Sequence, residues 1–121
     1  MKRDLDLVRK ILLVCEEHPN GFAPQELHIE GYTDDQIGYH VHLAGNAGLL
    51  KVADVTHLGS QSPCAIPLSM TWSGHEFLDD SKNETVWEKA KKSVGSSSFD
   101  VLKAVLVGLG TEVGMKAAGL R

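Results

Sequence analysis

Residues 33–50 constrain the fold more than any other stretch of this 121-residue chain. Thr33 suits the N-cap of a helix, because its hydroxyl can accept a hydrogen bond from an unpaired backbone N–H, and Gln36 completes a capping box. The two aspartates between them suit the positive end of the helix dipole. Gly48 fits the left-handed position at which many helices end. We therefore predict one helix over residues 33–48.

The predicted helix is amphipathic. Its apolar positions recur at the helical period, and we expect the core-facing side to carry Ile37, Val41, Ala44 and Ala47. His40 lies at the margin of this side, where we expect a hydrogen bond to the backbone. The opposite side is expected to meet solvent or a partner, and it carries Asp35, Gln36, Tyr39, His42 and Asn46.

A β-hairpin is predicted directly after this helix. Residues 51–57 alternate as a strand does, residues 58–63 are turn material, and residues 64–71 form a second strand that Pro67 displaces toward an edge. The polar residues that the hairpin offers to a partner are Lys51, His57 and Gln61.

Further helices are predicted on both sides of this centre. Residues 4–17 show the helical period, and helices are also expected to begin at Trp72 and to cover residues 85–94. Pro24 permits a short helix over residues 25–28, and an extended loop is the alternative. Residues 95–98 are expected to be a flexible joint.

The end of the chain has a strongly helical period over residues 99–120. An apolar face suited to an oligomer or partner contact carries Phe99, Leu102, Val105, Leu106, Leu109 and Val113. Three glycines interrupt it, and each costs about 1 kcal/mol relative to alanine within a helix. Close approach of another helix would offset this cost, and the alternative is a helix that frays after Leu109.

The helix that ends in Ala47-Gly48-Leu49, the hairpin, and the turn Thr71-Trp72-Ser73-Gly74 together resemble the winged helix-turn-helix superfamily. The resemblance implies a mainly α fold with a small β-hairpin wing (α+β) over residues 1–95. Residues 96–121 would then be a C-terminal helical extension. Residues 33–48 would be the recognition helix, which in this superfamily enters the major groove of DNA.

A narrower resemblance rests on the opening MKRDLDLVRKIL, on Trp72-x-Gly74-His75-Glu76-Phe77-Leu78, and on Thr85-Val86-Trp87. These segments are similar to those of a family of small bacterial and prophage proteins known only as a domain of unknown function. This resemblance implies a fold and a setting in mobile elements, and it implies no activity.

The charge distribution leaves two functions open. Residues 1–80 carry five Lys/Arg against twelve Asp/Glu, a net of −7, whereas residues 81–121 have a net of +3. DNA-binding domains usually show the reverse, and the predicted recognition face has no Lys or Arg to contact bases. The first hypothesis is a DNA-binding transcriptional regulator that dimerises through residues 99–120. The second is a protein-interaction module, such as a phage-encoded modulator of host machinery, that does not bind DNA.

Enzymatic chemistry is not indicated by the sequence. His40 and His42 lie about 200° apart around a helix, so they cannot bind one metal ion together. Cys15 and Cys64 have no metal-ligand spacing, and no serine stands in a nucleophile motif. We expect no enzyme activity, cofactor or metal, no membrane segment, and a cytoplasmic protein with reduced cysteines.

Tryptophans and lysines in the second half admit two interpretations. Trp72 and Trp87 suit core packing, and contact with a partner is the alternative. Lys89, Lys91 and Lys92 suit a solvated helix face, and phosphate contact is the alternative.

Overall fold

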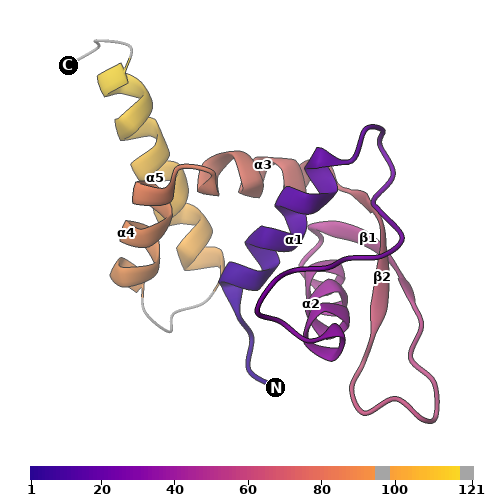
Figure 1. The fold of residues 1–121 in the computed structure, drawn as a ribbon. Coiled ribbons are helices and arrows are strands. Elements are labelled where there is room, and N and C mark those ends of the chain that lie inside the picture. The colour runs from indigo at the N-terminus through magenta and orange to yellow at the C-terminus, as the bar shows by residue number, and fades with distance from the viewer. Residues whose placement is uncertain (95–98, 118–121) are drawn as a thin grey trace. The chain divides into compact units, whose positions relative to one another are not determined.

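The computed structural model describes residues 1–94 and 99–117, with side chains for 1–94 and 99–109. Over this range the elements are α1 (Leu5–Glu17), α2 (Asp34–Asn46), β1 (Leu50–Asp54), β2 (Ala65–Met70), α3 (Trp72–Ser81), α4 (Glu84–Val94) and α5 (Phe99–Ala117) (Figure 1). The described chain is therefore mainly helical with a two-stranded antiparallel sheet, which confirms the α+β class.

The chain divides into two compact units, Met1–Glu76 and Phe77–Arg121. We describe each unit by itself. The domain boundary expected near residue 95 stays a prediction, and the joint expected over residues 95–98 lies outside the described residues.

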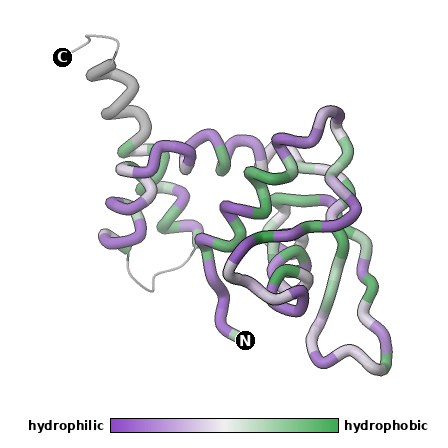
Figure 2. The backbone as a smooth tube through the Cα atoms, viewed as in Figure 1, coloured by the Kyte–Doolittle hydropathy of each residue, from purple (hydrophilic) through white to green (hydrophobic). Residues whose placement is uncertain are grey.

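Helix α1 begins where Asp4 caps it, because the Asp4 Oδ1 accepts a hydrogen bond of 3.2 Å from the Leu7 N–H. Hydrophobic and hydrophilic residues alternate along the helix from turn to turn (Figure 2). The buried residues are Leu7, Val8, Arg9, Ile11, Leu12 and Cys15. Arg9 is the one charged residue in this buried set.

Helix α2 forms as predicted. The Thr33 hydroxyl accepts from the Gln36 N–H at 3.1 Å, and the Gln36 side chain accepts from the Thr33 N–H at 2.8 Å. Gly48 has a φ of +76° and reverses the chain after the helix. The predicted core positions are buried except Ala47, which is exposed because it is the C-cap, where the chain leaves the helix.

No helix forms over residues 25–28, so the loop alternative is the correct one. The Ala23 N–H donates to the Leu68 carbonyl at 2.8 Å, which ties the segment to β2. Leu27 is buried in the core. These two anchors hold residues 23–27 along the hairpin in an irregular path.

Strands β1 and β2 pair in antiparallel register, from Leu50 opposite Met70 to Asp54 opposite Ala65, with a bulge near Lys51. Residues 55–64 connect them, a longer tip than the predicted 58–63. The early strand end has a local cause. The Val55 N–H still donates to the Cys64 carbonyl at 2.9 Å. Beyond this bond the Asp54 Oδ1 accepts from the Thr56 N–H and the Thr56 Oγ1 accepts from the Cys64 N–H, both at 2.8 Å, so side chains take the place of further backbone pairing.

The hairpin lies against α2 at two glycines. A Cβ atom built on Gly45 would lie 2.6 Å from Val52 Cγ2, and one built on Gly38 would meet the Cys64 Sγ. No ordinary side chain fits at either position without displacing its neighbour. The hairpin therefore approaches the backbone of α2 closely.

In the second unit, α4 packs on α5. Trp87 is fully buried, as predicted, and Phe77 contacts both Trp87 and Phe99 with ring centroids 5.9 and 5.2 Å apart. The Asn83 side chain caps α4 by accepting from the Val86 N–H at 3.0 Å. An aromatic cluster thus forms the core of this unit.

Candidate functional site

The outer face of α2 is polar, and several of its side chains contact one another. Asp35 and Asn46 are exposed, whereas Tyr39 and His42 are half-buried. The Tyr39 and His42 rings stack with centroids 6.2 Å apart, and the Asn46 Nδ2 lies 3.5 Å from the His42 Nε2. The structure therefore places four of the five predicted residues along one line of the helix. Gln36 differs, because its side chain is engaged in the capping box.

This face carries no cation that could pair with phosphate. Helix α2 contains no Lys or Arg, and Asp34 and Asp35 begin it. Asp54 adds a further carboxylate: hydrogen bonds from the Thr56 side chain and backbone hold its pKa below the usual value, with a smaller contribution from His42. The cationic side chains with which a DNA-reading helix neutralises phosphate charge are absent from α2.

The predicted hairpin residues do not form a basic wing. Lys51 and Gln61 are exposed, but the His57 Nδ1 accepts from the Gly59 N–H at 3.1 Å and so belongs to the local turn. Leu58 at the tip is fully exposed. The tip therefore presents an apolar side chain beside few charged ones.

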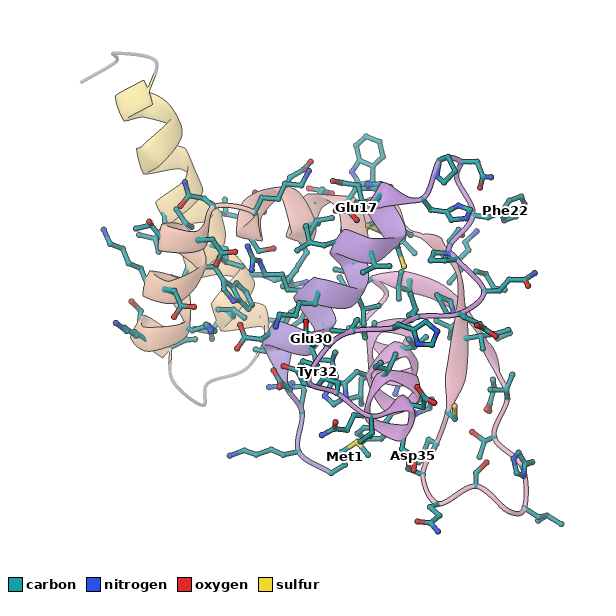
Figure 3. The ribbon with its side chains drawn as sticks, viewed as in Figure 1. Met1, Glu17, Phe22, Glu30, Tyr32 and Asp35 are labelled. Carbon is teal, nitrogen blue, oxygen red and sulfur yellow. The ribbon has the colours of Figure 1, made fainter. Side chains whose placement is uncertain are left out.

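Four large apolar side chains stand exposed on or beside β2, and we call them the outer strand surface: Phe22, Ile66, Leu68 and Trp72. Phe22 is 72% exposed and projects from the loop that Ala23 ties to Leu68 (Figure 3). Trp72 is 81% exposed. Exposed aromatic side chains near other apolar ones are typical of protein-binding surfaces.

The exposure of Trp72 overturns the expectation that it packs in the core. Thr71 caps α3, since its Oγ1 accepts from the Gly74 N–H at 3.0 Å. Trp72 therefore occupies the first helical position, whereas Gly74 faces the Leu49 backbone. The Thr-x-x-Gly spacing is the sequence signal from which this orientation could have been derived.

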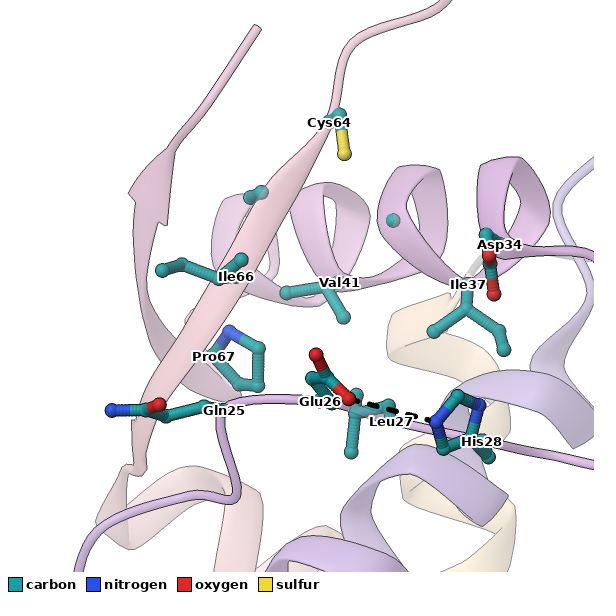
Figure 4. Close-up of a pocket in the computed structure, with 12 residues that line it drawn as sticks. Gln25, Glu26, Leu27, His28, Asp34, Ile37, Val41, Cys64, Ile66 and Pro67 are labelled. Carbon is teal, nitrogen blue, oxygen red and sulfur yellow. Dashed lines mark ion pairs between the residues drawn. The ribbon is translucent and has the colours of Figure 1, made fainter.

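A groove in the first unit lies between residues 25–28, α2 and β2 (Figure 4). Its volume is about 290 Å³. The lining residues are Gln25, Glu26, Leu27, His28, Asp34, Ile37, Gly38, Val41, Cys64, Ala65, Ile66 and Pro67. The sequence did not reveal this groove, because it depends on the irregular path of the loop beside β2.

The buried histidine is structural. His40 is 1% exposed and lies on α2 as predicted, with its Nδ1 2.7 Å from the Gln36 carbonyl oxygen. Its Nε2 accepts from the Asp4 N–H at 2.8 Å. Both ring nitrogens are thus occupied, so His40 is unsuited to metal binding or proton transfer at a surface.

The predicted oligomer face of α5 is partly used inside its own unit. Leu102 and Leu106 are buried, Phe99 contacts Phe77, and Val105 and Leu109 are half-buried. The Val113 side chain and Leu120 lie outside the described residues. Among the α5 residues whose side chains are described, Val101 and Val107 are exposed. A dimer through α5 stays a prediction.

Of the three lysines Lys89, Lys91 and Lys92, Lys91 makes contacts within the second unit. It lies over the Trp87 ring at 5.5 Å and pairs with Glu88 at 3.2 Å. These contacts favour the interpretation of the cluster as a solvated helix face.

The two cysteines differ in surroundings. Burial raises the pKa of the Cys15 thiol to about 11, so it stays protonated and unreactive near neutral pH. Cys64 is half-buried beside Gly38. Among the described residues no three His, Cys, Asp or Glu side chains gather as a metal site requires. No described helix has the length and apolarity to cross a membrane.

The comparisons with known proteins agree with the narrower resemblance seen in the sequence. The model of a family described as "Hypothetical protein (DUF2513)" matches residues 2–100. A Haemophilus influenzae protein named "Uncharacterized protein" is 36% identical over 109 residues, which cover 84% of this chain and 85% of that protein. No solved structure matches the chain. The family match spans most of the sequence, and the chain belongs to the DUF2513 family.

Proposed function

We propose that this chain is a small, non-enzymatic regulatory protein whose first unit is a winged-helix-type domain that binds another protein. The observation that carries the proposal is the outer strand surface, where Phe22, Leu68 and Trp72 stand exposed. Burial of such side chains against a partner is favoured by the hydrophobic effect, and aromatic side chains are frequent among the residues that dominate binding energy.

The order of elements in the first unit supports the winged-helix assignment. Helix α2 is followed by the β1–β2 hairpin and then by α3, as in a recognition helix, wing and final helix. The irregular segment between α1 and α2 departs from that plan, since a helix-turn-helix has a helix there. The departure removes the element that would cross the DNA backbone.

The electrostatics of the first unit support a protein partner over duplex DNA. Residues 1–76 carry five Lys/Arg against ten Asp/Glu, a net of −5. Phosphate neutralisation supplies most of the affinity of non-specific DNA binding, so an acidic surface opposes it. The outer face of α2 is therefore better suited to a protein surface than to the major groove.

A DNA titration tests the choice between the two classes of partner. Labelled random duplex DNA is titrated with the full chain at about 50 mM salt, where electrostatic binding is strongest. We expect no binding at tens of micromolar protein. Micromolar binding that weakens steeply with added salt would overturn the proposal in favour of a DNA-binding regulator.

A variant comparison tests the surface itself. Proteins that co-purify with the chain from its native host are quantified for the wild type, for the double variant F22S/W72S, and for the control V55S/L58S. The control removes two exposed apolar side chains from the hairpin tip. A partner retained by the wild type and control but lost from F22S/W72S is the expected result. Equal retention by all three would contradict the role of this surface.

A further inference from the structure

We propose that the groove between residues 25–28, α2 and β2 binds a lysine or arginine of the partner together with an adjacent aliphatic residue. This inference rests on the proposed protein-binding function and names the chemistry of the segment that is recognised. The groove is distinct from the outer strand surface, although Ile66 contributes to both.

The groove exists because the loop separates from β2 after a single hydrogen bond. The Ala23 N–H donates to the Leu68 carbonyl at 2.8 Å, and Pro24, whose φ is fixed by its ring, follows directly. Within the described part of the chain, no further backbone hydrogen bond joins residues 24–28 to residues 65–67. The space between the two segments is therefore open to a side chain from outside.

The floor of the groove is apolar. Ile37 and Val41 point from α2 toward Leu27 on the loop (Figure 4). Pro67 contributes a further apolar wall from β2. A volume of about 290 Å³ lies just below the roughly 300–1,000 Å³ typical of small-ligand sites. It suits one long side chain and part of its neighbour better than a whole folded element.

The rim of the groove is acidic. Glu26 and Asp34 line it, and none of its twelve lining residues is Lys or Arg. The Glu26 Oε2 lies 3.8 Å from the His28 Nε2, but both side chains are more than four-fifths exposed. An exposed pair of this kind contributes little, so a cation from a partner can replace it.

Lysine and arginine match this combination of floor and rim. Their aliphatic stems pack on apolar surface while the charged end remains near solvent and carboxylates. The net charge of −5 over residues 1–76 also favours the approach of a basic partner. A purely apolar ligand would leave the two carboxylates of the rim unpaired.

The test uses the full ¹⁵N-labelled chain and two short peptides, acetyl-Gly-Leu-Lys-Leu-Gly-amide and its Lys→Glu counterpart. We expect the lysine peptide to shift the amide resonances of residues 25–28 and 37–41, with a dissociation constant of about 1 mM. We expect the glutamate peptide to bind at least about tenfold more weakly, because it meets two carboxylates. Equal shifts with both peptides, or shifts confined to other residues, would overturn the inference.

Matched variants locate the contact. Asp34→Asn and Glu26→Gln should each weaken the lysine peptide about threefold to fivefold, an effect expected of one partly exposed ion pair. Asp35→Asn and Glu30→Gln are the controls, because they remove the same charges from the same helix turn and loop but do not line the groove. Equal weakening of peptide binding by the test and control variants would show that only the net charge of the chain matters, and it would refute the site.

The result is separable from the test of the proposed function. If the peptide does not bind but F22S/W72S still loses a partner, the groove inference fails alone. If duplex DNA binds and the peptide does not, both fail together.

Discussion

The Nε2 of His40 accepts a hydrogen bond of 2.8 Å from the backbone N–H of Asp4, which lies 36 residues earlier. The Nδ1 of the same ring lies 2.7 Å from the Gln36 carbonyl oxygen. Asp4 in turn caps α1 through one carboxylate oxygen and accepts from the Tyr32 hydroxyl with the other, at 3.1 Å. One imidazole therefore joins the start of α1 to the first turns of α2.

His40→Phe should lower the free energy of unfolding by about 2–4 kcal/mol, because it leaves the Asp4 N–H without its acceptor and removes a second hydrogen bond. Urea unfolding followed by circular dichroism measures the loss. His42→Phe is the control, since His42 lies on the outer face of α2 and should change stability by less than about 1 kcal/mol. Similar losses for both variants would contradict the structural role of His40.

Two glycine-to-alanine substitutions should have opposite signs. A Cβ atom on Gly74 would overlap the Leu49 carbonyl oxygen and crowd Met70, so Gly74→Ala should destabilise the first unit by about 2 kcal/mol or more. A Cβ atom on Gly108 meets nothing within 4 Å, so Gly108→Ala should stabilise α5 by up to about 1 kcal/mol. Thermal unfolding of both variants and the wild type gives the comparison. A gain in stability from Gly74→Ala would show that α3 does not approach the Leu49 backbone as described.

The cysteines should differ in reactivity. Alkylation by iodoacetamide at pH 8 should modify Cys64 at least about tenfold faster than Cys15, because the reactive species is the thiolate and Cys15 is both buried and protonated. Mass spectrometry of the two peptides against time gives the rates. Faster modification of Cys15 would mean that α1 opens readily.

Cys15 also predicts how stability depends on alkaline pH. Its pKa is about 11 in the folded chain and 9.0 for the unperturbed thiol. Between these values the unfolded chain releases a proton that the folded chain retains, so stability falls as pH rises through this window. The loss attributable to Cys15 should approach about 2–3 kcal/mol at the upper end. Urea unfolding at pH 8 and pH 10.5 should show a smaller decline for Cys15→Ala than for the wild type.

Leu106→Ala should unfold the second unit more easily by about 2–5 kcal/mol, because Leu106 is fully buried within the monomer. Val107→Ala is the control at the neighbouring, exposed position. The unfolding midpoint should not depend on protein concentration. A midpoint that rises with concentration and a loss only in oligomer size would show that Leu106 acts between chains, as the sequence pattern first suggested.

The central helix was predictable because its signals are local. Thr33 and Gln36 form their reciprocal hydrogen bonds within one turn, and Gly48 needs only its own backbone conformation. The same is true of the buried side of α2, where the helical period identifies Ile37 and Val41. The prediction that Ala47 is buried was wrong, because the helical period does not indicate where the chain leaves the helix.

The candidate surfaces were harder to predict because they depend on contacts distant in sequence. The groove requires the Ala23 N–H to bond the Leu68 carbonyl and the loop to leave β2 after that bond, and neither residue indicates the other in the sequence. The exposure of Trp72 follows from its position directly after Thr71, the cap of α3. That signal is local, but the hydrophobicity of tryptophan suggests burial instead. Residue type predicted burial well for Trp87 and wrongly for Trp72.

Gly38 and Gly45 lie seven residues apart in α2, about two helical turns, and so face the hairpin from one side. Gly38 lines the groove, whereas Gly45 contacts Val52 on β1 and lies outside it. Because β2 is both the partner of β1 and one wall of the groove, the close approach at Gly45 contributes to the distance between α2 and that wall. A single methyl group at that position would push the strand pair outward and loosen the groove's hold on a ligand. The selectivity of the groove is thus adjustable at a residue that no ligand touches.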